Sequence, residues 1–390
     1  MNASRIMFSG FGLCSSLGGY KDACAAYRAG LNRFSAHTEV KTMFPGNEEP
    51  APLTVAPAAC NIFAYQGLAR TVKLFQFAYA DLLDNIEQDL PQENIALLFT
   101  MPDPLEREQN LDIDEEFARE QRLQEYVDAL KVPLFTICPG LKDIPMQCSF
   151  GERAAFARVL KKAITLLNTG KVDHCLVMVA DSLLDDHMLQ VQLQENRLKT
   201  EDNPVGYIPG EGAAAILLSS EALSKSDKNR EPLAANINVS IDNRTVDEQI
   251  PEIEDEAQLD KLIDQQQRAS WHGEKLVNVL TDLLGDSYEQ QSFPQHISDI
   301  NGEEHRAIEL GNTLVKLRLQ CPSASFSEVQ VPALGFGEVG AVMGPLALMT
   351  VAAAVQRGYA TQREFVITLS DESGKRAAIK LLFSAPKEEE

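Results

Sequence analysis

The chain has 390 residues, 44% of them hydrophobic and 24% charged, which is the composition of an ordinary globular protein with a large core. Its 57 acidic residues against 35 basic ones give a formal net charge of −22, which repels phosphate backbones and anionic lipids, so neither nucleic acid nor a membrane is expected as a partner. No apolar run reaches the roughly 20 residues that span a bilayer, and the opening residues lack a secretion signal, so we expect a cytoplasmic protein.

Cysteine and histidine usage argues against a disulfide framework and against a metal site. The seven cysteines are an odd number scattered along the chain, and neither CxxC nor HExxH occurs. The six histidines have no close ligand spacing. The glycine-rich turn around Ser15 and Ser16 lacks the lysine of a phosphate-binding loop. We therefore expect no metal and no cofactor.

Hydrophobic periodicity predicts alternating strands and helices in the first half of the chain. Gly10, Gly12 and Gly18 are assigned to a turn after the first strand. The polar, acid-rich residues 106–130 are assigned to a solvated surface helix or helix pair. Residues 149–152, Ser-Phe-Gly-Glu, have the form of a capping box, which predicts a helix start there. Strands are predicted at residues 6–9, 95–100, 175–180 and 213–218, and helices at residues 22–30, 66–84 and 154–167.

The second half repeats the same order of elements after a polar stretch at residues 220–260. The stretch contains an acid-rich run at residues 248–256, and we place a boundary near residue 235. The repetition predicts two duplicated halves, residues 1–235 and 236–390. Helices are predicted at residues 274–284, 304–317 and 345–356, and strands at residues 297–300, 364–370 and 377–383.

Four segments in a fixed order resemble the β-ketoacyl synthase branch of the thiolase superfamily. Residues 9–30 are similar to its opening strand, turn and helix, and residues 151–182 to its nucleophile helix and following strand. Residues 206–213 are similar to its glycine-glutamate-glycine segment, and residues 340–344 to its glycine- and alanine-rich loop. The resemblance covers nearly the whole chain. It implies a thiolase-like, five-layered αβαβα sandwich made of two duplicated halves. It also implies a dimer formed through the strand that precedes the nucleophile helix.

The resemblance implies that catalysis requires a cysteine thiolate at a helix N-terminus, together with two histidines that stabilise the enolate and the thioester oxyanion. Counting back without gaps from Gly170 places Arg153 in the position of that cysteine. Asn301 stands at the place of the first histidine, and Gly337 or Glu338 at the place of the second. Each of the three expected reactive groups is therefore changed.

Two further features of that family are changed as well. Ala333 and Leu334 stand where a lysine is expected, and residues 371–376 do not resemble the phenylalanine-glycine gate. An arginine stays protonated at any accessible pH, so Arg153 cannot deliver a nucleophile. We interpret the chain as a catalytically inactive member of the fold.

The positive charge of Arg153 at a helix N-terminus opposes the helix dipole and calls for a compensating partner. One hypothesis is that Arg153, Glu338 and Asn301 converge and fill the former acyl site with a charge-assisted network. The alternative is that Arg153 pairs with Glu152 or with a solvent-facing acid.

Two other positions carry open alternatives. Cys148 is predicted on the strand before the helix, where it is either a nucleophile in a rearranged site, with His174 or His305 near it, or a small buried hydrophobic residue. Asp181 and Ser182 follow a predicted strand, where they either bind a ligand or cap the next helix.

The function favoured by the sequence is non-enzymatic: a protein-binding scaffold or adaptor with the synthase fold. One version is a non-catalytic partner subunit of an active β-ketoacyl-ACP synthase in fatty-acid or polyketide synthesis, so that the dimer is either homotypic or formed with a synthase-like subunit. Another is an adaptor for a protein cargo such as a secreted effector, with residues 106–130 and 248–256 as contact surfaces. A third alternative is an acyltransferase or condensing enzyme that uses Cys148.

Overall fold

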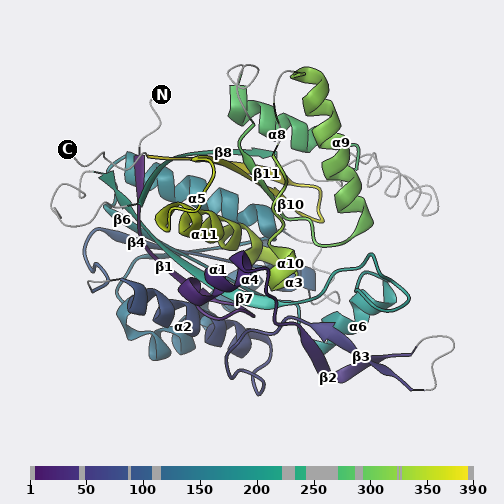
Figure 1. Ribbon diagram of the computed structural model, residues 1–390. Helices are drawn as coiled ribbons and strands as arrows, with labels where there is room; N and C mark the ends of the chain where they lie inside the picture. The colour runs from purple at the N-terminus through teal and green to yellow at the C-terminus, as the bar shows by residue number, and fades with distance from the viewer. Residues whose placement is uncertain are drawn as a thin grey trace.

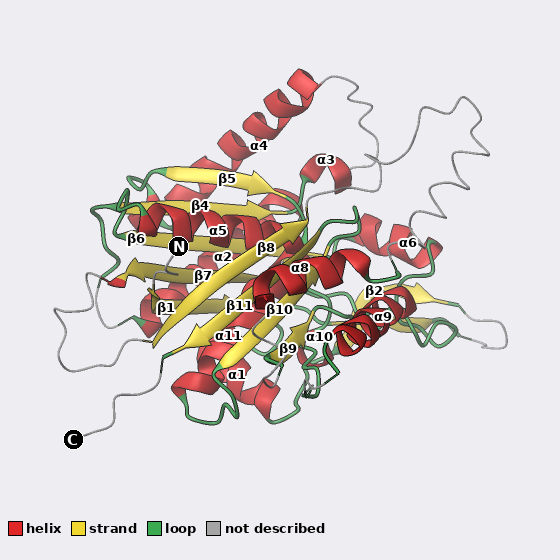
Figure 2. Ribbon diagram, turned by 90° about the horizontal axis from the view of Figure 1, so that it is seen from above, coloured by secondary structure: helices red, strands yellow, loops and turns green. Residues whose placement is uncertain are grey.

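In the computed structural model the chain forms one nine-stranded sheet, a separate two-stranded hairpin, and helices that cover the sheet (Figures 1 and 2). The structure describes residues 5–43, 49–86, 89–107, 116–221, 233–242, 271–285, 293–322, 325 and 327–384. The strands are β1 (Arg5–Cys14), β2 (Ser35–Thr42), β3 (Ala51–Val55), β4 (Ile95–Met101), β5 (Met146–Phe150), β6 (His174–Ser182), β7 (Glu211–Ser220), β8 (Leu233–Asp242), β9 (Gln295–Ser298), β10 (Glu364–Ser370) and β11 (Arg376–Phe383). The helices are α1 (Tyr20–Arg28), α2 (Gly67–Asn85), α3 (Pro104–Arg107), α4 (Glu116–Ile137), α5 (Arg153–Asn168), α6 (Asp186–Gln194), α8 (Glu274–Leu284), α9 (Glu304–Gln320), α10 (Ala333–Phe336) and α11 (Met343–Gln356), with 3₁₀ turns η1 (Pro139–Leu141) and η5 (Gly340–Val342).

The nine strands divide into two parts that enclose a pair of helices. Their order is β5-β4-β6-β7-β1-β8-β11-β10-β9, and β1 joins the parts because it pairs with β8 only through residues 5–8. Helices α5 and α11 lie between the parts (Figure 1). Helices α2 and α4 cover the outer face of the first part, and α8 and α9 cover that of the second. This is the expected five-layered αβαβα sandwich.

The strand pairings show the duplication directly. The series β1-β7-β6-β4 has two antiparallel pairings followed by a parallel one, and so does the series β8-β11-β10-β9. Strand β5 then adds parallel to β4, and Gln330 forms a parallel bridge with Ile297 of β9 at the matching place. The two halves therefore repeat one topology, with α5 and α11 in equivalent positions.

Burial explains why α5 and α11 occupy the central layer. Helix α5 carries the predicted apolar stripe, and both Phe156 and Leu160 are fully buried in it. Helix α11 is buried on all sides from Met343 to Ala353, as a helix enclosed by two sheet parts must be. Its small alanine and glycine residues let the neighbouring elements approach closely; a Cβ on Gly344 would lie 2.6 Å from the Phe156 ring.

The assignment of Gly10 and Gly12 to a turn is wrong, because both lie inside β1. Their role is close packing against α2. A Cβ on Gly12 would lie 2.1 Å from the backbone oxygen of Ala78, so only glycine allows the helix to rest on the strand at this point. The turn itself is confined to residues 15–18, which a pair of backbone hydrogen bonds closes.

The predicted capping box is also wrong. Ser149 lies in β5, and its hydroxyl donates to the carbonyl of Phe99 in β4 rather than to a helix N–H. Helix α5 begins at Arg153, and Glu152, its N-cap residue, makes no side-chain cap bond. The strand and the helix are joined by Gly151, whose φ of +145° permits the sharp change of direction.

The acid-rich segment is less solvated than expected. Within residues 106–130 the structure describes the end of α3 and most of α4, while residues 108–115 lie outside the described part. Leu130 and Leu134 of α4 are fully buried against the first part of the sheet. The other predicted contact surface, residues 248–256, lies outside the described residues.

The elements that were not predicted include the β2–β3 hairpin, α6, β8 and the short helix α10. The hairpin and β8 are only partly buried, so their sequences lack the apolar pattern that identifies a core strand. Residue 235, the predicted division between the halves, lies within β8, and the two-domain division stays a prediction. Among the described helices, none combines the length and the apolar character needed to cross a bilayer.

Candidate functional site

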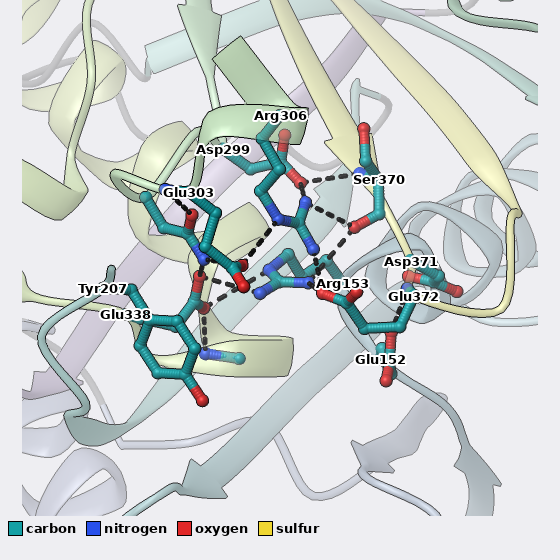
Figure 3. Close-up of polar contacts among 12 residues, drawn as sticks. Glu152, Arg153, Tyr207, Asp299, Glu303, Arg306, Glu338, Ser370, Asp371 and Glu372 are labelled. Atoms are coloured by element: carbon teal, nitrogen blue, oxygen red, sulfur yellow. Dashed lines mark hydrogen bonds and ion pairs between the residues drawn. The ribbon is translucent and has the colours of Figure 1, made fainter. Parts of the chain in front are cut away.

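Arg153 is the first residue of α5, and its side chain lies in the interior of the molecule rather than at the surface. The residue is 5% exposed. Its guanidinium makes a two-point contact with Glu338, with Nη2 at 2.7 Å from Oε2 and Nε at 3.3 Å from Oε1 (Figure 3). Nη1 donates to the backbone oxygen of Ser370 at 3.2 Å. A planar fork facing a carboxylate in this way gives both strength and fixed geometry.

Glu338 lies in the segment before α11 and is 1% exposed. Besides Arg153, its carboxylate accepts from the Gly340 N–H at 2.7 Å and from the Asn301 side-chain amide at 2.8 Å. Arg153, Asn301 and Glu338 therefore converge, as the first hypothesis predicted. The alternative holds only in part: the Glu152 carboxylate accepts instead from the backbone N–H of Glu372, whereas the partly exposed Glu372 carboxylate lies 3.5 Å from Arg153 Nη1 as a second partner.

Of the two candidates for the second histidine position, only Glu338 can project a side chain into this network. Gly337 has a φ of +75°, and a Cβ there would lie 2.7 Å from the Cβ of Ala56 and 3.0 Å from the oxygen of Ile208. The glycine allows the segment to pass between its neighbours and delivers Glu338 to Arg153.

Around this trio lies a larger network of arginines and carboxylates, which we call the ionic cluster. Arg306 donates to Ser370 at 3.0 Å and pairs with Glu372. Arg197 holds Glu303 through two hydrogen bonds of 2.8 and 3.1 Å and lies 3.0 Å from Glu372. The ionic cluster consists of Arg153, Arg197, Asp299, Asn301, Glu303, Arg306, Glu338 and Glu372.

The cluster sets the charge state of its members. Burial by itself would lower the pKa of Arg153, but the carboxylates of Glu338, Glu372 and Asp299 outweigh it and raise the pKa well above its ordinary value. Burial raises the pKa of Asp299 to about 6, although Arg306 and Arg153 oppose this. The guanidinium is thus fixed in its charged form, and it offers neither a lone pair nor a labile proton for chemistry.

Carboxylates also compensate the N-terminus of α5. The Ala154 N–H donates to Asp371 Oδ1 at 2.7 Å, which satisfies one of the free donors of the first turn. A negative charge at this position interacts favourably with the helix dipole, which Arg153 alone would oppose. Residues 371–376, where the phenylalanine-glycine gate was expected, therefore supply two acids, Asp371 and Glu372, that balance the arginine.

Comparison with known proteins identifies the architecture. No protein-family model matches the sequence, and no curated protein matches it. Solved structures do match over nearly the full length: the ishigamide ketosynthase/chain length factor (15% identity, 97% of this chain and 99% of that chain, TM-score 0.62) and a β-ketoacyl synthase from Burkholderia phymatum STM815 (12%, 98% and 100%, TM-score 0.58). A third is the type II polyketide synthase complex AntDE:AntF, an acyl-carrier protein with its ketosynthase bound to the hexaketide (10%, 98% and 99%, TM-score 0.67). The chain has a β-ketoacyl synthase-like thiolase fold.

Within this synthase-like fold, Cys148 lies on β5 as predicted, but its surroundings do not activate it. Burial raises the pKa of the thiol to about 12, so it stays protonated near neutral pH. Its Sγ donates a long hydrogen bond to the neighbouring Ser149 carbonyl, at 4.0 Å. His174 instead contacts the Ser219 hydroxyl, and His305 stacks on Trp271. The structure does not bring these histidines to the thiol.

Asp181 and Ser182 do not cap a helix, since the N-cap of α6 is Asp185. Asp181 is buried, lies 2.7 Å from Arg107, and accepts from the Ala341 N–H at 2.8 Å. Ser182 donates to Glu211, a fully buried carboxylate that also pairs with Arg70. Asp181 therefore fixes the loop that follows Glu338. Through this loop it helps to hold Glu338 in its place in the ionic cluster.

A cavity of about 700 Å³ opens at the outer side of the ionic cluster, with Arg197, Arg306, Trp271 and His305 in its wall. Glu303, His305 and Glu372 have ligand atoms within 4.8 Å of one another, a spacing that suits a metal ion. Both carboxylates, however, already bind arginines, whose charges oppose a cation at this place. These three residues are better described as the part of the site that faces the cavity than as a metal site.

The sequence predicted the centre of the site and missed its periphery. Arg197, Glu303, Arg306 and Glu372 come from three separate segments, since Glu303 and Arg306 both lie at the start of α9, and none belongs to a motif. The only available signal was that Asp371 directly follows the predicted strand 364–370 and that Asp299 lies near the end of the predicted strand 297–300, where polar side chains of an α/β protein gather at one edge of the sheet.

Proposed function

We propose that this chain is a catalytically silent relative of the β-ketoacyl synthases that acts by binding another protein. The observation that carries the proposal is the buried contact between Arg153 and Glu338, joined by Asn301. In the resemblance described above, these three residues stand at the positions of the nucleophile and the two histidines.

The chemistry of the site supports the absence of condensing activity. Condensation through a covalent acyl group requires a thiolate and groups that stabilise an oxyanion. Here a permanently charged guanidinium replaces the thiol, and a carboxylate, which would repel an oxyanion, stands beside it. The Asn301 amide donates to Glu338 and Glu303, and the Gly340 N–H donates to Glu338, so these donors are not free to stabilise a developing negative charge.

The exposed edge of strand β5 supports a role in binding another protein chain. Strand β5 is a terminal strand of the nine-stranded sheet, and among the described strands only β4 pairs with it. An unpaired strand edge is a ready site for pairing with another chain. The proposed dimer uses this edge, either with a second copy or with a synthase-like subunit.

The names of the structural neighbours favour one version of this role, a non-catalytic partner subunit. Two neighbours are named as a ketosynthase with a chain length factor, and a third is an acyl-carrier protein in complex with its ketosynthase. We propose that this chain pairs with an active synthase in the same manner. The adaptor for an unrelated cargo is the competing version.

Incubation with a labelled acyl thioester tests the silence of the site. The wild-type protein and Cys148→Ala should both show no covalent label, beside an active synthase as the positive control. Labelling of the wild type that Cys148→Ala abolishes would contradict the proposal and restore the enzyme that uses Cys148.

Co-expression with a synthase from the same host tests the partner. A stable one-to-one complex in size-exclusion chromatography with light scattering would support the partner subunit. A chain that stays separate from every synthase of its host would favour the cargo adaptor.

A further inference from the structure

Two cysteines outside the ionic cluster lie in contact with each other. Cys14 is the last residue of β1, and Cys60 lies in the loop after β3; their Sγ atoms are 3.6 Å apart. They come from segments 46 residues apart in sequence and are both free thiols. Closing a disulfide requires the sulfurs to move together by about 1.5 Å, to a bond of ~2.05 Å.

The two thiols differ in accessibility and in acidity. Cys14 is 5% exposed, whereas Cys60 is only half-buried. The hydrogen bond from Cys14 lowers the pKa of Cys60, and the positive charge of Arg70 acts in the same direction. The same hydrogen bond and burial raise the pKa of Cys14 well above its ordinary value. Cys60 is therefore the more acidic thiol of the pair, with Cys14 as its hydrogen-bonding partner.

The other buried thiols lack this property. Burial raises the pKa of Cys24, Cys148 and Cys175 to about 12 and that of Cys138 to about 11. Thiolate character and exposure together decide which cysteine an oxidant attacks. Cys60 differs from all four in the direction of its pKa shift, and from Cys24, Cys138 and Cys175 in exposure as well, because those three are buried.

We propose that Cys60 and Cys14 form a redox modification site, in which a peroxide oxidises Cys60 and Cys14 resolves the product to a disulfide. Cys60 gives its proton to solvent and attacks one peroxide oxygen as the thiolate; the O–O bond breaks, Cys60 becomes a sulfenic acid, and the departing hydroxide takes that proton to leave as the first water. Cys14 sulfur then attacks the Cys60 sulfur, the S–O bond breaks, and the hydroxide leaves as water with the Cys14 proton. Two thiols thus lose two electrons, and one peroxide is reduced to two waters.

The position of the pair gives the disulfide a structural consequence. The loop that carries Cys60 is already held by hydrogen bonds from Ala58 N–H to Glu211 and from Ala59 N–H to the Ser15 carbonyl. Ala56, at its start, packs against Gly337, next to Glu338. A covalent link from Cys60 to β1 would fasten this loop beside the segment that supplies the ionic cluster.

Peroxide treatment of the reduced, full-length protein tests the proposal. After hydrogen peroxide, the number of thiols titrated under denaturing conditions should fall by two from the initial seven, and non-reducing peptide mapping should find Cys14 linked to Cys60. A reductant should restore the full count. A wild-type protein that keeps all its thiols, or links a different pair, would overturn the proposal.

Variants separate the two steps. In Cys14→Ser the sulfenic acid has no resolving thiol, so dimedone should label Cys60 several-fold more than in the wild type; Cys60→Ser should lose no further thiol at the same dose. Cys148→Ser is the matched control and should form the disulfide like the wild type. Equal dimedone labelling of Cys60 in the wild type and in Cys14→Ser would contradict a resolving role for Cys14. The wild-type mapping decides the matter by itself if a variant fails to fold.

Discussion

Arg153 and Glu338 lie 185 residues apart in sequence, yet their side chains meet 2.7 Å apart in the interior. One begins α5 and the other precedes α11, the two helices that occupy equivalent places in the halves of the molecule. The contact therefore joins the two halves at their common centre. It also uses the helix N-terminus that the resemblance assigns to a reactive thiol.

The effects of substituting Arg153 and Glu338 on the free energy of unfolding should be strongly coupled. Arg153→Met leaves the carboxylate of Glu338 buried without its main partner, which should lower the free energy of unfolding by about 3–5 kcal/mol. The double variant Arg153→Met/Glu338→Gln should cost clearly less than the sum of the single variants. Urea unfolding measures all three.

A matched control is Arg28→Met, because Arg28 stacks on the ring of Tyr359 at the surface rather than pairing with a buried acid. This change should cost below about 1 kcal/mol. Additive effects of Arg153→Met and Glu338→Gln would contradict the coupling.

Asp299 should make stability depend on pH. Burial raises its pKa from 3.8 to about 6, so the folded protein holds this proton more tightly than the unfolded chain does. This tighter proton binding contributes to the free energy of unfolding. The contribution is full below about pH 4 and is lost as the pH rises through 6. Asp299→Asn cannot ionise, so it should gain about 3 kcal/mol relative to the wild type between pH 4 and pH 7.

Chemical unfolding of both proteins across this pH range measures the difference. Parallel stability curves for the wild type and Asp299→Asn would show that the group does not titrate in this window.

Gly340 is required for the contact between Asp181 and the loop after Glu338. Its φ is +55°, and a Cβ there would lie 2.0 Å from Asp181 Oδ2. Gly340→Ala should therefore combine a left-handed strain of about 1–2 kcal/mol with displacement of Asp181, and should lower the melting temperature strongly.

Gly358→Ala is the control, because Gly358 has a φ of +69° and no atom within 4 Å of the added Cβ. It should show the strain alone. An equal fall in melting temperature for the two alanine variants would contradict the prediction, because it would show that the clash with Asp181 adds no destabilisation.

The open edge of β5 should carry the proposed dimer. Pro145 and Gly151 bond to β4 through their backbones, so by the alternation of a parallel ladder the N–H of Cys148 points away from β4. Cys148→Pro removes this outward donor and should shift the protein from dimer to monomer in light scattering. Cys148→Ala keeps the donor and should remain dimeric. An unchanged dimer in the proline variant would place the interface elsewhere.

Local pattern was sufficient for the elements of the core. The apolar stripe of α5, the continuous apolar run of β7 and the strands β10 and β11 were predicted to within a few residues, because a buried face imposes a period of two or 3.6 on the sequence. The β2–β3 hairpin was missed because β2 buries none of its residues and β3 only Leu53 and Val55, which is too short a period to recognise. The start of α5 was misplaced because a serine and a glutamate at capping-box spacing also suit the end of a buried strand.

The sequence by itself was sufficient to single out Arg153, Asn301 and Gly337 or Glu338 as candidates through the resemblance, since residue identity and spacing can be counted along the chain. Only the tertiary structure decided what surrounds them. Arg306, Arg197 and Glu372 reach the site from separate segments, and the charge balance of a buried site depends on every carboxylate within a few ångströms, whatever its distance in sequence. The contact of Cys14 with Cys60 was decided in the same way, because nothing local relates the end of one strand to a loop beyond a hairpin.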